Sequence, residues 1–431
     1  MRSRHRIMSL AVVVAEAVTV RPGLAQTSRG SWTAVAPMPI ALAGLAATTG
    51  LGGRIFAIGG GFGSCSSPNS YTVNQAEAYD PATNRWSRLT PMPISRSSLA
   101  AATGRDGRIY TFGGWNNDSN YYTLNTAEVY DPSRNTWSAI APMPTAREDP
   151  VAATGRDARI YVIGGNTGAN GNPVLGALKT VEAYNPATNR WSVKAPMPTA
   201  RTDMGVATGP DGRIYVVGGV NERDDALNTV QVYNPATNTW RTVAPMPTPL
   251  GTLAAATGPD GRIYAIGGSR DTAAGQRTVN TVEAYDTAAN RWSTVAPMPA
   301  RRAGLATATG RDGRIYAMGG YSICPATRAV EAYTPAPLFV RVSLAHQALA
   351  AGQLQTATIT TWPAAQIAIT VTFPDHGSTR RTGTAGARGV FIWTFRQPRV
   401  AGSGGQVAHV TVTAHTPSGA SATAQNAYRI R

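Results

Sequence analysis

The chain has 431 residues, of which 42% are hydrophobic and 14% charged, and its formal net charge is +16. Its 45 glycines and 30 prolines are too many for a helical bundle, and no run of 18 apolar residues occurs, so we expect no transmembrane segment. Two cysteines exclude a disulfide-dense scaffold and a cysteine-based metal site.

The positive charge does not indicate nucleic-acid binding. The net charge is +4 before residue 31, +5 over residues 31–333 and +7 after residue 333, so the largest region is only mildly basic. Only Lys179 and Lys194 are lysines, and the excess is almost all arginine. We therefore expect no nucleic-acid partner.

The N-terminus resembles an export signal. Arg2, Arg4 and Arg6 precede a mostly apolar stretch over residues 7–20, and the small residues Gly23 and Ala25 fit a signal-peptidase site. This pattern predicts a signal peptide over residues 1–25 and a protein that is secreted or held at the cell surface. The alternative is a disordered leader on a cytoplasmic protein.

The region that follows is built from a repeat of about 50 residues. Each tryptophan precedes the first glycine of a Gly-Gly doublet by 27 residues, at Trp32, Trp86, Trp137, Trp191, Trp240 and Trp292. A tyrosine follows each doublet, and the next tryptophan comes seven residues later in five cases. Only the stretch from doublet to tyrosine varies in length. Such regular spacing indicates one structural unit repeated six times.

Each unit is predicted to form four short strands. In the fifth unit, for example, residues 253–257 and 263–266 are joined by a Gly-Pro-Asp-Gly-Arg turn, a third strand covers residues 282–285, and a fourth begins at the tryptophan. Small residues on the first strand suit a crowded innermost position. Six such antiparallel units predict an all-β fold, a six-bladed β-propeller.

The Gly-Gly, Tyr and Trp pattern, with Pro-Met-Pro after the tryptophan strand, resembles the kelch repeat over residues 31–333. Residues 32–39 supply a fourth strand without the first three, while residues 305–333 supply three strands without a fourth. The two fragments are therefore predicted to complete one blade, so that an N-terminal outer strand closes the ring and covers its open edge.

Residues that recur in every blade are assigned to the scaffold, and function is expected where the blades differ. The length-variable loops and the connections between blades share one face. On those connections, arginines recur at one position, followed two residues later by Asp149 and Asp203 in two blades. Leu42 and Leu250 replace the arginine in the other two blades. The arginines are Arg96, Arg147, Arg201 and Arg302.

Two interpretations of these arginines remain open. In the first, Arg96, Arg147, Arg201 and Arg302 rim the channel mouth and bind carboxylate or hydroxyl groups of a ligand together with Asp149 and Asp203. In the second, each arginine pairs with an aspartate or a loop carbonyl of the next blade.

Aromatic residues stand in the variable loops among Asn and Ser residues, and we expect Trp115, Tyr122 and Tyr321 to contact a sugar or a peptide. Phe62, Tyr71 and Tyr121 lie in similar positions. Alternatively, several of these rings pack against the loops that carry them.

Cys65 and Cys324 occupy the same loop type in blades that become neighbours on closure. We expect them to form a disulfide if the protein is exported; two unpaired thiols are the alternative.

The C-terminal region begins after a linker marked by Pro335 and Pro337. Alternating strands over residues 354–362, 367–373, 389–396 and 406–415 predict a small β-sandwich over residues 338–431, similar to the immunoglobulin-like modules of exported bacterial proteins. Its basic composition suits an acidic cell-envelope polymer. His376, His409 and His415 are expected to be surface or strand residues.

Two functions follow from this sequence. The first is a secreted, monomeric binding protein with no catalytic residue, metal or cofactor, which recognises a carbohydrate or protein ligand. The second is an enzyme resembling the kelch-like sialic-acid epimerases, with Asp149 or Asp203 beside an arginine that holds the acid group of the substrate. A copper-oxidase site of the kelch-like type is excluded because all five histidines lie outside residues 31–333.

Overall fold

We describe a computed structural model of the chain. It describes residues 30–62, 71–117, 122–168, 176–272, 275–322, 325–335, 341–346, 348–350, 353–361, 366–373, 377–385, 390–396, 406–415 and 421–430. All regular structure in these residues is β-strand. The predicted signal peptide, Cys65 and Cys324 lie outside the described residues.

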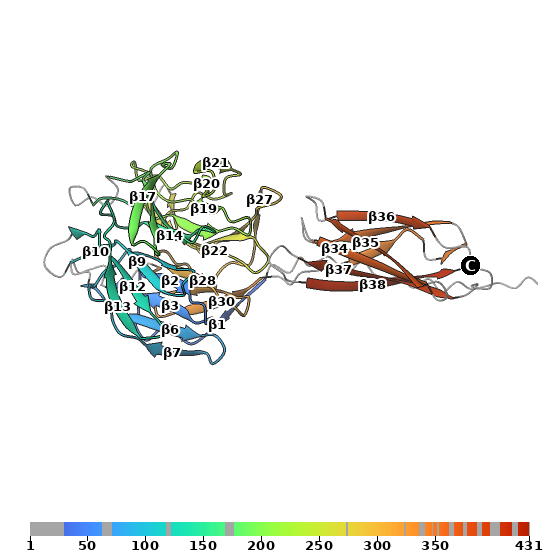
Figure 1. Cartoon of the computed structure of the whole chain (residues 1–431), viewed down its shortest axis with the longest axis horizontal. Helices are drawn as coiled ribbons and strands as arrows, with labels where there is room; N and C mark the ends of the chain where they lie inside the picture. The colour runs from blue at the N-terminus through green and yellow to red at the C-terminus, as the bar shows by residue number, and fades with distance from the viewer. Residues whose placement is uncertain are drawn as a thin grey trace, which may run out of the picture.

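The first part of the described chain forms six four-stranded antiparallel sheets, which we call blades (Figure 1). The innermost strands are β2 (Ala46–Thr49), β8 (Ala100–Thr103), β14 (Val151–Thr154), β18 (Gly205–Thr208), β22 (Ala254–Thr257) and β28 (Ala306–Thr309). The second strands are β3 (Ile55–Ile58), β9 (Ile109–Phe112), β15 (Ile160–Ile163), β19 (Ile214–Val217), β23 (Ile263–Ile266) and β29 (Ile315–Met318).

The third strands are β6 (Ala76–Asp80), β12 (Ala127–Asp131), β16 (Val181–Asn185), β20 (Val230–Asn234), β26 (Val282–Asp286) and β30 (Val330–Thr334). The outer strands are β7 (Arg85–Arg88), β13 (Thr136–Ile140), β17 (Arg190–Lys194), β21 (Thr239–Val243), β27 (Arg291–Thr294) and β1 (Ser31–Ala34). Strand β1 pairs with β30, so the first strand of the described residues is the outer strand of this sheet, and Trp32 lies opposite Tyr333.

Two circles of hydrogen bonds join the blades. At the inner end, each threonine hydroxyl donates to the carbonyl oxygen of the threonine in the preceding blade: Thr49 to Thr309 (2.8 Å), Thr309 to Thr257 (2.7 Å), Thr257 to Thr208 (2.8 Å), Thr208 to Thr154 (3.3 Å), Thr154 to Thr103 (2.8 Å) and Thr103 to Thr49 (2.9 Å). The circle returns to its starting residue, so these six strands surround one axis.

At the outer edge, each indole N–H donates to a carbonyl of the preceding blade: Trp32 to Ala296 (2.9 Å), Trp292 to Ala244 (2.9 Å), Trp240 to Ala195 (2.8 Å), Trp191 to Ala141 (2.8 Å), Trp137 to Thr90 (2.8 Å) and Trp86 to Ala36 (2.9 Å). Each tryptophan also packs on the tyrosine opposite it; the Trp32 and Tyr333 ring centroids are 5.1 Å apart. The recurring aromatic pairs therefore hold neighbouring blades together.

The glycine doublets are explained by close approach of the backbone. Gly113 has φ +62°, and a Cβ there would lie 2.3 Å from the carbonyl oxygen of Arg147 in the connection to the next blade. Any larger residue would push the two segments apart. The buried side chains between blades form separate clusters, one of which contains Tyr79, Tyr316 and Met318.

The variable loops carry three short hairpins in the described residues: β4 (Gly61–Phe62) with β5 (Tyr71–Thr72), β10 (Trp115–Asn116) with β11 (Tyr122–Thr123), and β24 (Ser269–Thr272) with β25 (Gly275–Thr278). They extend from the loops that join the second and third strands.

The C-terminal strands form two further sheets, drawn in orange and red in Figure 1. One contains β31 (Arg341–Leu344), β33 (Leu354–Thr360) and β36 (Val390–Arg396), and the other β32 (Ala348–Leu349), β38 (Ser421–Ile430), β37 (Val407–His415), β34 (Gln366–Phe373) and β35 (Gly377–Thr384). Both sheets contribute to one buried cluster, which includes Ile359, Trp393, Val371 and Val412. The immunoglobulin-like relationship of this part stays a prediction.

Candidate functional site

The candidate site is the mouth of the central channel, where six equivalent residues each lie two positions before an innermost strand. All six have a left-handed backbone: Gly44 (φ 61°), Ser98 (53°), Asp149 (50°), Asp203 (54°), Thr252 (51°) and Gly304 (61°). The chain must reverse here as it leaves one blade and enters the next, and a positive φ makes that turn. Non-glycine residues in this conformation are uncommon and often mark functional sites.

Backbone hydrogen bonds hold these positions in a rim. The N–H of Ser98 donates to the Gly44 carbonyl (2.7 Å), and the N–H of Asp149 donates to the Ser98 carbonyl (2.8 Å). On the opposite side, Thr252 donates to Asp203 (2.8 Å) and Gly304 to Thr252 (3.1 Å). The rim is therefore rigid, and only the side chains on it differ between blades.

The rim surrounds a cavity of about 910 Å³. Alanines and threonines of the innermost strands line its wall, as the small residues of these strands predicted. At the mouth, the lining includes Ser98, Asp149 and Asp203, together with the aromatic residues Phe62, Trp115 and Tyr321. The cavity thus combines an apolar wall with a few polar groups at one end, as in many ligand sites.

The two aspartates lie in neighbouring blades and influence one another. Burial raises the pKa of Asp149 to about 7, assisted by the charge of Glu148 and opposed by a hydrogen bond from the Ser98 hydroxyl. Burial also raises the pKa of Asp203 well above its usual value, and the charges of Asp149 and Asp224 add to this effect. Both carboxyl groups therefore favour the protonated form more than an exposed aspartate does.

Tyr321 completes this group from the last blade. Gly304 has no side chain, and a Cβ there would lie only 2.8 Å from the Tyr321 ring, so the ring covers the space above the glycine. Burial and the charges of Asp203 and Asp149 raise the pKa of Tyr321 to about 12. Asp149, Asp203 and Tyr321, all expected on this face, therefore line one cavity.

The four arginines lie inside the blades and not at the mouth, which corrects the expectation that they contact a ligand. Arg96, Arg147 and Arg201 are 0% exposed and Arg302 is 1% exposed. Each donates to the carbonyl of the first doublet glycine; Arg147 bonds Gly164 (3.1 Å) and Arg302 bonds Gly319 (3.1 Å). The alternative expectation, that each arginine bonds a carbonyl group of the next blade, agrees with these hydrogen bonds.

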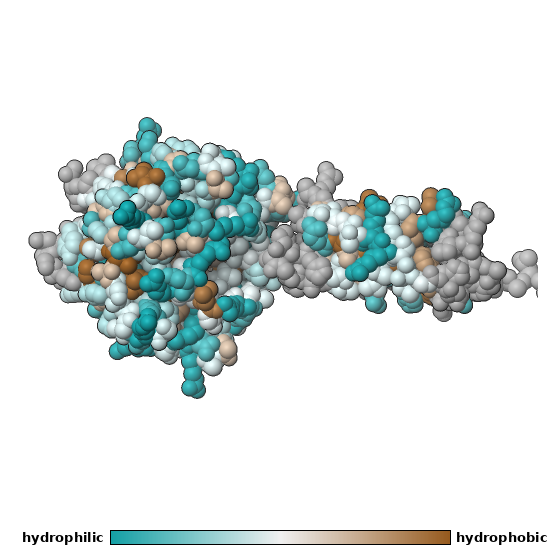
Figure 2. Space-filling view, in the orientation of Figure 1, coloured by the Kyte–Doolittle hydropathy of each residue, from teal (hydrophilic) through white to brown (hydrophobic). Residues whose placement is uncertain are grey.

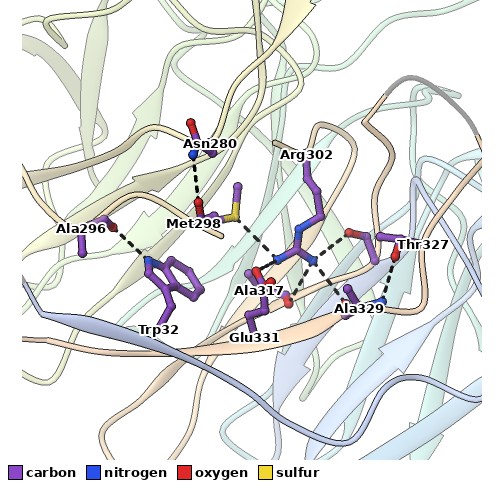
Figure 3. A network of polar contacts seen from close by, with 10 residues as sticks. Trp32, Asn280, Ala296, Met298, Arg302, Ala317, Thr327, Ala329 and Glu331 are labelled. Carbon is purple, nitrogen blue, oxygen red and sulfur yellow. Dashed lines mark hydrogen bonds and ion pairs between the residues drawn. The ribbon is translucent and has the colours of Figure 1, made fainter. Parts of the chain in front are cut away.

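A glutamate of the third strand neutralises three of these arginines. The ion pairs join Arg96 to Glu128 (3.0 Å), Arg147 to Glu182 (2.9 Å) and Arg302 to Glu331 (2.6 Å). Figure 3 shows the Arg302 guanidinium among the carbonyls of Ala317 and Ala329 and the Glu331 carboxylate. These three glutamates are therefore structural, and their partners are the arginines.

Three blades depart from this pairing. Arg201 faces the glutamate position occupied by Gln231, and burial lowers the pKa of Arg201 to about 10. Leu42 and Leu250 stand in place of the arginine and are buried. In the blade that follows Leu250, Glu283 accepts a hydrogen bond from the Thr248 hydroxyl (2.8 Å). Burial raises the pKa of Glu283.

Some of the aromatic residues of the variable loops line the cavity and others do not. Trp115 and Tyr321 line the cavity. Tyr122 is 45% exposed on β11 and is not among the lining residues. Phe62 and Tyr71 stack with centroids 5.7 Å apart on the β4–β5 hairpin, and both remain exposed. On the face shown in Figure 2, apolar residues form small groups among hydrophilic ones.

Family models match the same part of the chain. Residues 44–93 and 96–144 match the Kelch motif, and residues 151–333 match the KLHDC2/KLHL20/DRC7 Kelch-repeats domain. The chain is 30% identical over 178 residues to Kelch-like protein 35 of Mus musculus, and 31% identical over 201 residues to Kelch-like protein terF of Aspergillus terreus. The matches cover 41% and 45% of this chain, but 27% and 42% of the relatives, so the chain spans less than half of either relative.

Two solved structures share the fold. One, titled "Structure of YjhT", has a TM-score of 0.56 at 15% identity, covering 72% of this chain and 97% of that chain. The other, a fungal alcohol oxidase of the AA5 family in complex with copper, has a TM-score of 0.53 at 16% identity, covering 94% and 100%. At such identities the likeness concerns the fold alone. In the described part of this chain, no group of three His, Cys, Asp or Glu is placed to hold a metal, and no helix could cross a bilayer.

Proposed function

Because this chain is a kelch-repeat protein with a β-propeller fold, we propose that it is a non-catalytic binding module whose ligand site is the channel mouth. The proposal takes the ring to have six blades closed by β1. The pairing of β1 with β30 and the two returning circles of hydrogen bonds support this. Kelch repeats are protein-interaction scaffolds, so we take the ligand to be a polypeptide; a carbohydrate is the alternative.

One observation carries the proposal: at the rim, a single backbone position holds Gly, Ser, Asp, Asp, Thr and Gly in successive blades. The tryptophans and the glycine doublets recur in all six blades, and the buried arginine recurs in four. A repeated residue cannot mark one place on a ring, whereas these six side chains give the mouth an irregular chemistry above a cavity. Irregular positions on a rigid scaffold are where recognition is expected.

Selection from a displayed library of random peptides would test this. We expect binders that lose affinity when Tyr321 or Trp115 is changed to alanine. The matched control is Val193→Ala on β17, an outer strand, where the valine is 70% exposed. Binders that respond to the Val193 variant and not to the mouth variants would contradict the proposal.

We further propose that the protein is exported, with residues 1–25 removed, residues 31–333 as the ring and residues 338–431 as a spacer or attachment module. The leader pattern and the presence of Cys65 and Cys324 in equivalent loops support export. Mass spectrometry of protein from the native host should give an N-terminus at Gln26 and a mass two hydrogens below that of the reduced chain. Retention of residues 1–25 would contradict the export proposal.

A second candidate function is a sugar-modifying enzyme, and the raised pKa of Asp149, about 7, favours it. A carboxyl group with such a pKa can both donate and accept protons near neutral pH. The burial of the arginines removes the groups that were expected to hold the acid of a sialic-acid substrate. NMR of reducing sugars with the protein would show isomer exchange that Asp149→Asn abolishes; no exchange would leave the binding function.

A further inference from the structure

Two acidic side chains line the channel mouth without a positive one beside them. Among the described residues that line the cavity, none is Lys, Arg or His, whereas Asp149 and Asp203 are both present. No hydrogen bond or ion pair links the Asp203 side chain to another described residue. Asp203 thus lines the cavity without a described partner, where a nearby cation would favour its ionised form.

The arginines that could have supplied this cation are engaged elsewhere. Arg147 and Arg201 each stand two residues before one of the aspartates, yet both side chains turn into the blades. Arg147 pairs with Glu182 at 2.9 Å, and Arg201 donates to the carbonyls of Gly218 (2.9 Å) and Thr229 (3.1 Å). The positive and negative groups are thus only two residues apart along the chain, but the arginines lie inside the blades and the aspartates line the cavity.

From this arrangement we infer that the channel mouth binds a lysine or arginine side chain of a partner polypeptide, held between the carboxylates of Asp149 and Asp203. The inference rests on the proposed binding function and names its ligand. Phe62, Trp115 and Tyr321 also line the mouth, and aromatic faces attract cations. The alanine-rich wall below accommodates the aliphatic part of such a side chain.

Binding should be linked to proton release. The groups that face the pair are Glu148 beside Asp149, Asp224 from the loop of the fourth blade, and Tyr321 from the last blade; these add negative charge or none. Without a cation beside it, the pair therefore keeps a proton to a higher pH than exposed aspartates do. A cationic side chain favours the ionised carboxylates and displaces that proton, so affinity rises as the pH increases from 5.5 to 8.

The test uses four blocked pentapeptides, Gly-Gly-X-Gly-Gly, in which X is arginine, lysine, citrulline or glutamate. Citrulline has nearly the shape of arginine without its charge. Calorimetry of the full chain should give binding of the arginine and lysine peptides at least about tenfold tighter than the citrulline and glutamate peptides. In buffers of different ionisation enthalpy, the arginine peptide should release protons at pH 7.

The key variant is Asp149→Asn with Asp203→Asn, which keeps residues that tolerate the left-handed backbone. It should weaken binding of the arginine peptide about tenfold or more and abolish proton release. The matched control is Asp286→Asn, at the end of the third strand β26, since Asn185 and Asn234 occupy that position in other blades. Thermal unfolding of each variant shows whether it is folded.

The outcomes separate this inference from the function on which it rests. Equal binding of the arginine and citrulline peptides, or full retention of binding by the double variant, overturns the cationic ligand. If library selection yields neutral or acidic peptides that depend on Tyr321, the mouth is a binding site but the inference is wrong. If no selected peptide depends on the mouth, the proposed function fails.

Discussion

Buried charge at single residues distinguishes the blades more clearly than any surface feature. Glu128 and Glu283 occupy the same position in two blades, and both are at most 3% exposed. Arg96 neutralises Glu128, whereas Leu250 replaces the arginine that would neutralise Glu283. One blade therefore contains a buried ion pair, and the other contains a buried acid bonded to a hydroxyl.

We predict opposite effects when these glutamates are changed to glutamine. Glu128→Gln leaves Arg96 buried without its counterion and should lower the free energy of unfolding by about 3 kcal/mol. Glu283→Gln keeps an acceptor for Thr248 and should stabilise the protein at neutral pH. Denaturant unfolding of both variants measures the difference. Equal destabilisation would show that the arginine is not what Glu128 needs.

The pH dependence of the Glu283 effect follows from the direction of its pKa shift. Its pKa is raised in the folded state, so the folded state favours the protonated acid. The contribution of Glu283 to stability is therefore fully present below the unfolded pKa and is lost as the pH rises through the folded pKa. The increase in the free energy of unfolding caused by Glu283→Gln should vanish at about pH 4 and grow toward pH 7. An advantage independent of pH would contradict this explanation.

Thr252 is the β-branched residue on the rim with φ 51°. The left-handed conformation is costly for such a side chain, and glycine fills the same position at Gly44 and Gly304. Thr252→Gly should therefore stabilise the ring by about 1 kcal/mol. Thr242→Gly, in the extended strand β21, should destabilise it, because glycine weakens a strand. Thermal unfolding of the two variants would show opposite shifts; a loss in both would mean that Thr252 is not strained.

Among the elements, β1 is distinguished by its long separation in sequence from the blade it joins. Trp32 bonds Ala296 and packs on Tyr333 as Trp240 bonds Ala195 and packs on Tyr233. Both tryptophans are partly buried. The contacts of the N-terminal strand are therefore equivalent to those of an internal outer strand.

We predict that Trp32→Ala and Trp240→Ala lower the free energy of unfolding by similar amounts, about 2–3 kcal/mol each, because each loses a large packed ring and an indole hydrogen bond. Denaturant unfolding provides the comparison. A near-zero effect of Trp32→Ala beside a large effect of Trp240→Ala would show that β1 does not close the ring in solution.

In the whole molecule, the ring and the C-terminal sheets have separate buried clusters. We predict two transitions in calorimetry of the full chain, since each part has its own core. Trp32→Ala should lower only one of them, and the arginine pentapeptide should raise that same transition. A single transition, moved as a whole by the variant, would contradict the division into two parts.

The sequence predicted most of the repeating structure because repetition multiplies a weak local signal. The spacing from tryptophan to doublet located the strands, and the fragments at residues 32–39 and 305–333 predicted the pairing that β1 makes with β30. The site was predicted less well. Asp149 and Tyr321 line the cavity, and their role in ligand binding stays a prediction, but Tyr122 is not a lining residue and the arginines lie inside the blades.

The order of residues along the chain determined which positions repeat and which do not, since spacing is a property of the sequence itself. Only the tertiary structure decided the direction in which each side chain points. Arg147 and Asp149 are two residues apart, but the left-handed turn at the rim sends one into the blade, where carbonyls and Glu182 bind it, and leaves the other at the cavity. The direction of each side chain depends on which buried groups lie close enough to bind it, and those groups come from other parts of the chain.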